Sequence, residues 1–214
     1  MNKTVVYYTS NREDITFENN IRQNLQETIK DIPLVSVSQK PIDFGNNICV
    51  GDVGASNLNV FRQMQIGTEA AKTEFVILAE ADYLHPKEYF EYEPKEQNIF
   101  YCAMPIYVLF INKGKQKIFS AKKRYCEGAI ITGRDFLLEC LEKMLDGQPM
   151  WSNSEISLPY LFELGKTETF YTTIPLVTFK TDAQLHRRVA HKVNTKTREL
   201  PHWGSVNELM RKYF

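Results

Sequence analysis

The sequence predicts an α/β fold, a single Rossmann-like domain with a mostly parallel central sheet flanked by helices. Three observations lead to this prediction. Short apolar segments alternate with helical patterns in the first half of the chain, which is the order of a βαβ unit with a right-handed crossover. The second half is richer in β segments. The 214 residues, 43% hydrophobic and 24% charged, suit one soluble domain with a full core.

The elements of the first half follow from apolar periodicity and from residues that begin or end helices. Pro33 ends the first helix, and Ser56 is expected to cap the second, after a loop at 41–54 that is rich in turn formers. The expected elements are strands at 5–9, 34–38 and 75–79 and helices at 15–29 and 57–71.

The second half is expected to hold a smaller β-rich part, two helices and a polar, basic tail. Ser154 and Gly165 are expected to bound the second of these helices. The expected elements are a helical turn within 83–94, β structure at 98–111, a hairpin turn at 112–115 leading into 116–120, a strand at 128–132, helices at 134–145 and 156–164, a strand at 171–179 and a C-terminal helix at about 205–213.

The strongest chemical signal is the segment Phe75–Asp82, in which an apolar run ends in two carboxylates, Glu80 and Asp82. Residues i and i+2 of an extended chain point to the same side, so both acids are expected to project together. Such a pair at the carboxyl end of a strand can present a divalent cation to a ligand. The alternative is that the two acids only begin a solvated loop.

Polar residues also follow the first two strands, at 9–12 and 38–40. The carboxyl ends of parallel strands meet at one edge of a sheet, where α/β proteins bind ligands. Three polar strand ends at one edge favour the ligand-binding interpretation of Glu80 and Asp82 over the solvated loop.

The order of these features resembles the nucleotide-sugar glycosyltransferases of the GT-A fold, in particular family 2 and its small bacteriophage-type relatives. Residues 5–12 resemble the family's entry segment, which lines the nucleotide pocket. The turn at 54–57 and the helix with Arg62 resemble its G-x-x-x-x-R helix. Glu80-Ala81-Asp82 occupies the place of its D-x-D-type motif, with Glu at the first position.

Two later segments resemble the acceptor side of the same family. Residues 151–165, with Glu155, resemble the helix that carries the catalytic carboxylate, although Ser154-Glu155 replaces the family's more usual acidic pair. Residues 191–194 and 201–204 resemble the tail of the small relatives, where a histidine can complete the metal site. The resemblance therefore covers most of the chain, with a nucleotide-binding half at 1–95 and an acceptor-side half with the tail at 96–214.

The resemblance implies a metal-dependent, inverting transfer of a sugar from a UDP-sugar to a hydroxyl acceptor. Mn²⁺ or Mg²⁺ would be bound by Asp82 and His191, and a histidine ligand favours Mn²⁺. His186 and His202 compete with His191 for this role. Glu155 would deprotonate the acceptor hydroxyl. The nucleotide-binding residues would be Thr9, Ser10, Asn11, Arg12, Gln39, Arg62 and Glu80.

Two of these residues have a second interpretation. Glu80 would contact the metal through water or the ribose instead of binding it directly. Arg62 would screen phosphate charge or else tie its helix to a loop.

Two other functions are compatible with the same fold. A nucleotidyltransferase shares the strand-end acids, but it usually has a glycine-rich phosphate loop after the first strand, and residues 9–12 contain no glycine. A non-enzymatic nucleotide- or nucleic-acid-binding module is the third hypothesis, because the fold alone does not fix the function.

The acceptor cannot be identified from motifs, but the charge distribution offers one candidate. The net charge is zero, yet basic residues cluster at 113–134 and at 187–198. These clusters would suit modified DNA of a bacteriophage, while a glycan or a small molecule remains an open possibility. The alternative is that the two clusters are solvated surfaces that bind no ligand.

The sequence also predicts where the protein works. The four cysteines form no CxxC pair, which argues against a zinc site or a disulfide framework and for a reducing cytoplasm, that of the host if a phage encodes the chain. No apolar run approaches the length of a membrane span, and the N-terminus does not resemble a signal peptide.

Overall fold

The structure is a computed structural model that describes residues 2–111, 117–121, 125–183 and 195–214. Its strands are β1 Lys3–Thr9, β2 Leu34–Ser38, β3 Asn46–Cys49, β4 Phe75–Glu80, β5 Tyr83–Leu84, β6 Ile99–Phe110, β7 Phe119–Ala121, β8 Ile130–Gly133, β9 Lys166–Lys180, β10 Lys196–Thr197, β11 Glu199–Leu200 and β12 Gly204–Ser205. Its helices are α1 Ile15–Ile29, α2 Asn57–Ala70, α3 Lys87–Glu91, α4 Arg134–Leu145 and α5 Val206–Tyr213, with 3₁₀ turns at Glu127–Ala129 and Leu161–Glu163.

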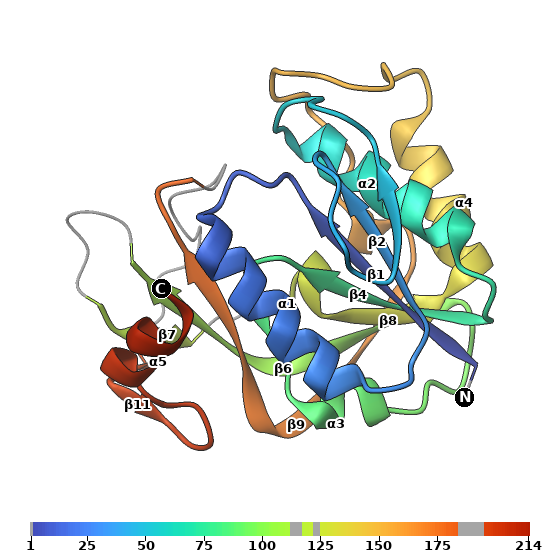
Figure 1. The fold of residues 1–214 in the computed structure, drawn as a ribbon. Helices are drawn as coiled ribbons and strands as arrows, with labels where there is room; N and C mark the ends of the chain where they lie inside the picture. Colours follow the sequence, from blue (N-terminus) through green and yellow to red (C-terminus); the bar gives the residue numbers. More distant parts are fainter. Residues whose placement is uncertain (1, 112–116, 122–124, 184–194) are drawn as a thin grey trace.

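The first half forms the parallel part of a ten-stranded sheet, in the order β3-β2-β1-β4 (Figure 1). Val5 pairs with Leu34 and Ile77 flanks it on the other side, so three strands run in the same direction. The predicted strands and helices of this half are confirmed, and the side chain of Ser56 caps α2 by accepting a hydrogen bond from the Asn59 amide. The expected loop at 41–54 is wrong in part, because Asn46–Cys49 adds β3 to the edge of the sheet.

The second half extends the sheet beyond β4 through β8, β6, β7 and β10. Strand β8 pairs antiparallel with β4 and β6, whereas β9 runs parallel to β6. The α/β fold class is thus confirmed, with the parallel pairs of the first half continued by a mixed, β-rich part. Strand β9 begins at Lys166, five residues before the expected start at Tyr171.

The helix expected at 156–164 is wrong. This segment is irregular and contains only the short 3₁₀ turn Leu161–Glu163. Pro159 explains the difference, since a proline inside a helix removes one backbone donor and disfavours helical geometry at the preceding residue, Leu158. The apolar residues Leu161 and Phe162 still pack in the core, which accounts for the helix-like pattern in the sequence.

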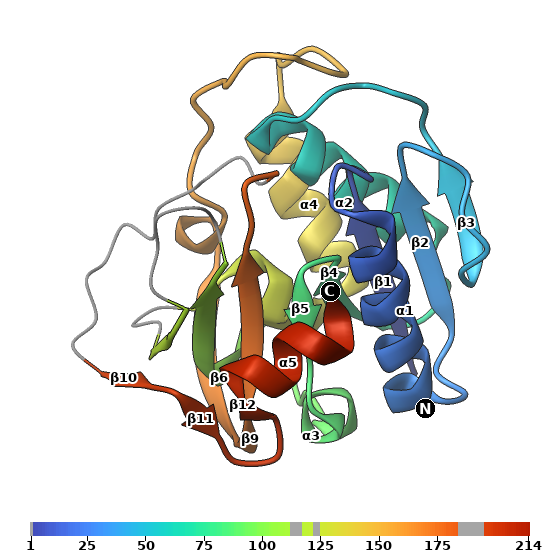
Figure 2. The same ribbon diagram turned by 60° about the vertical axis from the view of Figure 1, so that its left-hand side comes forward.

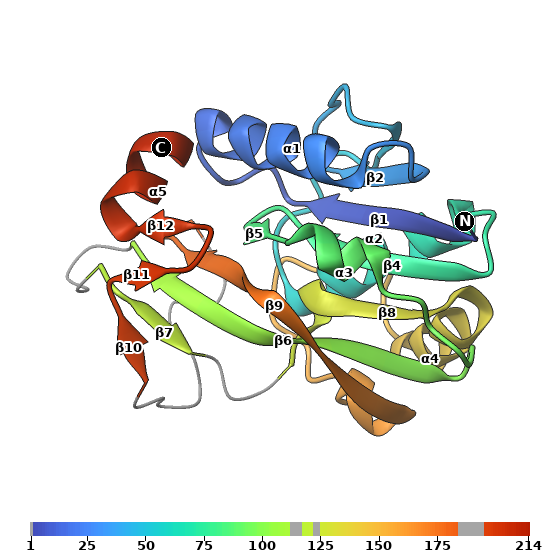
Figure 3. The same ribbon diagram turned by 90° about the horizontal axis from the view of Figure 1, so that it is seen from below.

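Helices cover both faces of the sheet. Alternate residues of β1 point to opposite faces, so Val5 and Tyr7 pack with Leu25 of α1, whereas Val6 and Tyr8 pack in the cluster that includes α2 and α4. Figures 1 and 3 show α1 on one side of β1 and β4, with α2 and α4 on the other.

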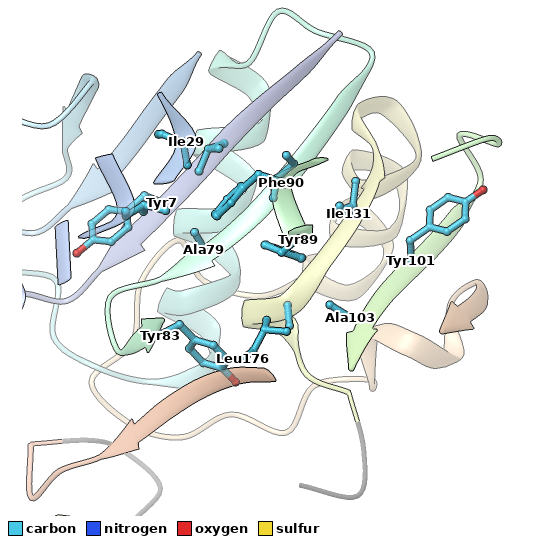
Figure 4. Packing of buried hydrophobic residues seen from close by; sticks show 14 of the residues in the cluster. Tyr7, Ile29, Ala79, Tyr83, Tyr89, Phe90, Tyr101, Ala103, Ile131 and Leu176 are labelled. Carbon is cyan, nitrogen blue, oxygen red and sulfur yellow. The ribbon is translucent and has the colours of Figure 1, made fainter. Parts of the chain in front are cut away.

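The core on the α1 face is continuous across both halves of the chain. Figure 4 shows its side chains extending from Tyr7 on β1 past Ala79 on β4 to Ile131 on β8 and Ala103 on β6. The two halves therefore share one buried layer, which holds the carboxyl ends of β1 and β4 in fixed register.

The C-terminal segment folds back against α1. The ring of Phe214 stacks on Phe17 with centroids 4.4 Å apart, and the Asn20 side chain donates to the carbonyls of Lys212 and Tyr213, both at 3.3 Å. Figure 3 shows α5 beside the N-terminal part of α1. The expected C-terminal helix is confirmed, with Ser205 as its cap.

Several expected features cannot be placed. The hairpin turn at 112–115, His186 and His191, and most of the two basic clusters lie outside the described residues. Among the residues that the structure does describe, no helix is long and apolar enough to cross a membrane.

Gly67 of α2 offers a test of how closely this helix lies on the sheet. A Cβ at this position would come within 2.5 Å of Val6 Cγ1 and 3.1 Å of Val37 Cγ2. Glycine to alanine inside a helix normally stabilises by about 1 kcal/mol. We expect Gly67→Ala instead to lower the free energy of unfolding by about 1–3 kcal/mol, measured by urea denaturation, because it overpacks the interface.

Glu69→Ala, at an exposed position of the same helix, is the matched control and should change the free energy of unfolding by less than about 0.5 kcal/mol. A Gly67→Ala protein as stable as the wild type would contradict the close approach of α2 to β1 and β2.

Candidate functional site

The carboxyl ends of β1, β2 and β4 meet at one edge of the sheet. Thr9 pairs with Ser38, the last residue of β2, and Tyr8 pairs with Glu80, the last residue of β4. The buried Gln63 side chain of α2 donates to the Thr9 carbonyl at 2.8 Å and to the Val37 carbonyl at 3.2 Å. The expected convergence of three polar strand ends is therefore present in the structure.

Asn11 joins the loops that follow β1 and β2. Its Oδ1 accepts from the backbone amides of Gln39 and Lys40, each at 2.9 Å. Its backbone has φ of +52°, a left-handed conformation that asparagine adopts more readily than most residues. The Asn11 side chain is thus used in shaping the edge of the sheet, where it closes one loop over the next.

Gln39 and Thr9 are buried and fully engaged within the same edge. The Gln39 side chain donates to the Gly54 carbonyl at 2.5 Å, and Thr9 donates through Oγ1 to Glu18 at 3.0 Å. Ser10 is half-buried and Arg12 is exposed, and neither side chain has a hydrogen bond within the described part of the chain. Of the predicted nucleotide-binding residues in these loops, Ser10 and Arg12 are therefore the ones free to contact a ligand.

Glu80 and Asp82 contact different elements. Glu80 ends β4, and its Oε2 lies against Gly128, where an added Cβ would come within 2.6 Å of this oxygen. Asp82 lies in the turn between β4 and β5, where its Oδ2 accepts from Thr178 Oγ1 of β9 at 3.2 Å. Both residues are half-buried, and they lie at the edge of the sheet where β4 ends.

Both acids act on the phenol of Tyr83. Burial raises the pKa of Tyr83 well above its usual value, and the neighbouring Cys126, Glu80 and Asp82 raise it further. Tyr83 is therefore a neutral hydroxyl, at 2.6 Å from Cys126 Sγ. Its ring lies next to Gly128, as Glu80 Oε2 does.

The type of donor atom at this edge suits Mg²⁺ or Mn²⁺, which prefer oxygen ligands. The described residues contain no group of three or more His, Cys, Asp or Glu side chains placed to hold a metal ion. A metal here would be held as Mg²⁺ usually is, by one or two carboxylates, with the remaining positions filled by water and phosphate oxygens. His191, the predicted third ligand, lies outside the described residues.

Arg62 fastens α2 to the segment after α4. Its guanidinium donates to the carbonyls of Leu145, Gln148 and Pro149 at 3.1–3.3 Å, and to Gln65 at 3.0 Å. These hydrogen bonds match the second interpretation of this residue, a tie between its helix and a loop. The phosphate-binding role of Arg62 stays a prediction.

Glu155 lies at the N-terminus of α2 and not in a helix of its own. It is exposed, and its Oε2 accepts from the Asn57 amide at 3.4 Å. A carboxylate is favoured there because the first amides of a helix are unpaired and carry partial positive charge. The structure therefore brings Glu155 to the rim formed by the loop 50–56, and the described contacts do not join it to Glu80 or Asp82.

Sequence reasoning missed two acids beside the β1 end. Glu18 of α1 is buried and accepts from Thr9, Asn11 and Arg22 at 3.0–3.1 Å. The available signal was a glutamate next to the apolar positions of α1, with an arginine four residues later. Burial raises the pKa of Glu13 to about 7, despite a hydrogen bond from Thr181, and Asp82 and Glu18 add to the rise.

No protein-family model and no curated protein sequence matches this chain. Solved structures do match, all at low identity. The inositol-1-phosphate CTP transferase from T. maritima is 10% identical, with a TM-score of 0.51 over 87% of this chain and 92% of that one.

Two glycosyltransferases are also similar in structure. S. aureus TarS 1–349 in complex with UDP-GlcNAc is 12% identical, with a TM-score of 0.48 over 90% of this chain and 62% of that one. A glycosyltransferase involved in the glycosylation of the major capsid of PBCV-1 is 13% identical, with a TM-score of 0.45 over 82% and 92%. The chain has a GT-A-like α/β fold, similar to that of the inositol-1-phosphate CTP transferase.

His85 packs under this site and makes the stability of the protein dependent on pH. Its ring stacks between Tyr83 and Tyr89, and Nε2 lies 2.7 Å from the Gly128 carbonyl. Burial lowers the pKa of His85 to about 4, and the hydrogen bond to Gly128 only partly offsets this. Between this value and the ordinary 6.5, the unfolded state binds more protons, so stability falls as the pH falls.

We expect His85→Gln to reduce this loss of stability between pH 6.5 and pH 4, which amounts to at most about 3 kcal/mol. Urea denaturation at several pH values measures it, with His202→Gln, at an exposed position, as the control. The raised pKa of Glu13 acts in the opposite direction between about 4.5 and 7, so variants are compared with the wild type at each pH. An unchanged pH slope in His85→Gln would contradict the neutral, buried histidine.

Proposed function

We propose that the protein is a metal-dependent glycosyltransferase that transfers a sugar from a UDP-sugar to a hydroxyl acceptor with inversion. The observation that carries the proposal is the edge of the sheet where β1, β2 and β4 end. Two half-buried acids, Glu80 and Asp82, lie there, next to loops that Asn11 and Gln39 hold in place. In α/β sheets this edge is where ligands bind.

The proposed roles follow from position and donor type. Asp82 binds Mn²⁺ or Mg²⁺, and Glu80 binds the metal through water or contacts the ribose. Ser10 and Arg12, which have free side chains, contact the nucleotide. A metal held by Asp82 would supply positive charge beside the leaving diphosphate.

The transfer step needs one proton acceptor. The acceptor oxygen forms the new bond to the anomeric carbon while the bond from that carbon to the UDP oxygen breaks, and the acceptor hydroxyl loses its proton. Glu155 is proposed to take this proton, since it is an exposed carboxylate at the rim of the same edge. The inversion at carbon follows from direct displacement.

A nucleotidyltransferase is the alternative that a specific observation favours. One structural match, with a TM-score of 0.51, is the inositol-1-phosphate CTP transferase. The absence of glycine from residues 9–12 counts against this alternative, because such enzymes usually cradle a triphosphate with a glycine-rich loop. The products separate the two functions, since a glycosyltransferase releases UDP from a UDP-sugar and a nucleotidyltransferase releases pyrophosphate from a nucleoside triphosphate.

We expect the wild-type protein with Mn²⁺ to release UDP slowly from a UDP-sugar, by hydrolysis when no acceptor is present. Asp82→Asn keeps an oxygen that can accept from Thr178, so the fold should persist, while UDP release falls at least about 100-fold because a neutral amide is a poor metal ligand. Chelation should abolish the reaction, and added Mn²⁺ should restore it.

Asp135→Asn is the control for charge, since Asp135 is exposed in the first turn of α4, where β8 ends beside the start of β4. Full activity of Asp82→Asn, or activity that survives chelation, would contradict the metal mechanism. Release of pyrophosphate from a nucleoside triphosphate and a sugar phosphate would replace it by the alternative.

Modified DNA is the acceptor that the basic clusters suggest, and Lys196 and Arg198 are exposed members of one cluster. If DNA binds, its affinity should fall steeply with salt. Changing both residues to Glu should lower the slope of log Kd against log salt by about 2, because two phosphate contacts are lost.

The exposed Lys72, three residues before the start of β4, is the matched control, and Lys72→Glu should leave this slope unchanged. DNA binding with no salt dependence would contradict the phosphate contacts of this basic cluster. No DNA binding below physiological salt would exclude DNA as the acceptor and leave a glycan or a small molecule.

A further inference from the structure

Asn59, in the first turn of α2, ties the Glu155 segment to the nucleotide side of the site. Its side chain is buried, with 1% of its surface exposed. Nδ2 donates to the carbonyl of Ser152 at 2.9 Å, and Oδ1 accepts from the amide of the same residue at 2.9 Å. One carboxamide therefore makes both backbone hydrogen bonds of Ser152, a residue 93 positions away.

The segment from Ser152 to Glu155 is fixed at both ends on the same turn of helix. Ser152 is held by Asn59, and Glu155 accepts from the Asn57 amide. Between them, the Ser152 hydroxyl donates to the Ser154 carbonyl at 2.8 Å and accepts from the Ser154 amide at 3.1 Å. Figure 2 shows the segment after α4 passing by the start of α2.

The same carboxamide also reaches the loop that precedes α2. Asn59 Nδ2 donates to the carbonyls of Val53 at 2.8 Å and Gly54 at 3.2 Å. The Gly54 carbonyl is also the acceptor for the Gln39 side chain. Gly54 has φ of +78°, and a Cβ there would collide with the Asn153 side chain, so the glycine lets the two segments approach.

These contacts form a continuous chain across the edge of the sheet. Asn11 binds the backbone of Gln39, Gln39 binds Gly54, and Gly54 and Ser152 share the side chain of Asn59. The links from Asn11 to Gln39 and from Asn59 to Ser152 join segments that are distant in sequence, while the link from Asn59 to Gly54 spans five residues. A shift of the loops after β1 and β2 would therefore move the segment that carries Glu155.

We propose that Asn59 is a positioning residue that fixes Glu155 relative to the loops that hold the nucleotide. The position of Glu155, the proton acceptor, then depends on the order of the loops after β1 and β2. This inference rests on the proposed function and adds to it a residue that does not touch substrate. Asn59 acts through Ser152 and Glu155, and misplacing a reacting group by about 1 Å can cost about 100-fold in rate.

The test compares Asn59→Ala and Asn59→Asp in the full chain. Asn59→Asp is isosteric and keeps an acceptor for the Ser152 amide but loses the three donations. Because the new carboxylate would face the carbonyls of Val53, Gly54 and Ser152, urea denaturation must first show that this variant folds. We expect both to lower kcat for transfer of the sugar from a UDP-sugar by about 10- to 100-fold, with the donor KM changed less than threefold.

The decisive readout is the double variant with Glu155→Gln. If Asn59 acts through Glu155, then Asn59→Ala should lower kcat no further in a protein that already lacks the base. An equal loss of kcat in both backgrounds would show a general structural role and overturn the inference. Asn20→Ala is the matched control, because Asn20 likewise ties a distant backbone segment to a helix, at the C-terminus.

Hydrogen exchange distinguishes failure of this inference from failure of the proposed function. The Ser152 amide should exchange faster in Asn59→Ala than in the wild type, whether or not the protein turns over a UDP-sugar. If the wild type transfers no sugar but the Ser152 amide exchanges faster in Asn59→Ala, the proposed glycosyltransferase function is overturned, and with it the catalytic role of Asn59. If the exchange rate of the Ser152 amide is the same in Asn59→Ala and the wild type, Asn59 does not hold the Ser152 segment and the inference is overturned.

Discussion

The hydrogen bonds of Asn11 are the interaction on which the edge of the sheet depends. Its Oδ1 holds two amides of the loop after β2, while its Nδ2 donates to Glu18 at 3.1 Å. Glu18 also accepts from Thr9 through Oε1 and from Arg22 through Oε2, so both oxygens of the buried carboxylate have a hydrogen-bond partner. Removing one partner of such a buried pair costs about 3–5 kcal/mol, which makes the network a rigid base for the loops.

Most of the fold could be predicted because its first half has local signals. The strands at the centre are continuous apolar runs, and Ser56 and Pro33 mark the ends of helices through their own backbone chemistry. The predicted helix at 156–164 is wrong because Pro159 disfavours helical geometry there, although the apolar spacing of the segment is typical of a helix. Strand β3, Asn46–Cys49, could not be predicted because it lies at the edge of the sheet and has only four residues. These residues are exposed or half-buried, so they show no apolar pattern.

The candidate site was predictable only in part. Strand ends can be read from sequence, so Glu80, Asp82, Thr9 and Gln39 fall at the expected edge. Contacts between distant segments cannot be read in this way, and Asn59 and the tie from Arg62 to the loop after α4 both depend on such contacts. Tertiary hydrogen bonds carry no periodicity, and a lone polar residue in a helix looks the same whether it faces solvent or another loop.

The site combines residues that hold its loops in place with residues at the rim that are proposed to contact the ligand. Asn11, Gln39 and Gln63 use their hydrogen-bonding groups within the protein, which fixes the loops, while Ser10, Arg12, Glu80 and Asp82 present groups at the rim. A pre-organised edge of this kind lowers the entropy that binding must offset. A fold similar to that of the inositol-1-phosphate CTP transferase does not by itself fix the reaction, so the chemistry depends on what these rim groups bind.

The central claim is that Asp82 binds a metal together with a nucleotide diphosphate. Paramagnetic broadening of backbone amide resonances by Mn²⁺ in the presence of UDP tests it most directly. The account predicts broadening centred on Asp82 and its neighbour Thr178, little effect at Lys72, and loss of the pattern in Asp82→Asn. Broadening that is absent at Asp82, or that persists unchanged in Asp82→Asn, would contradict it.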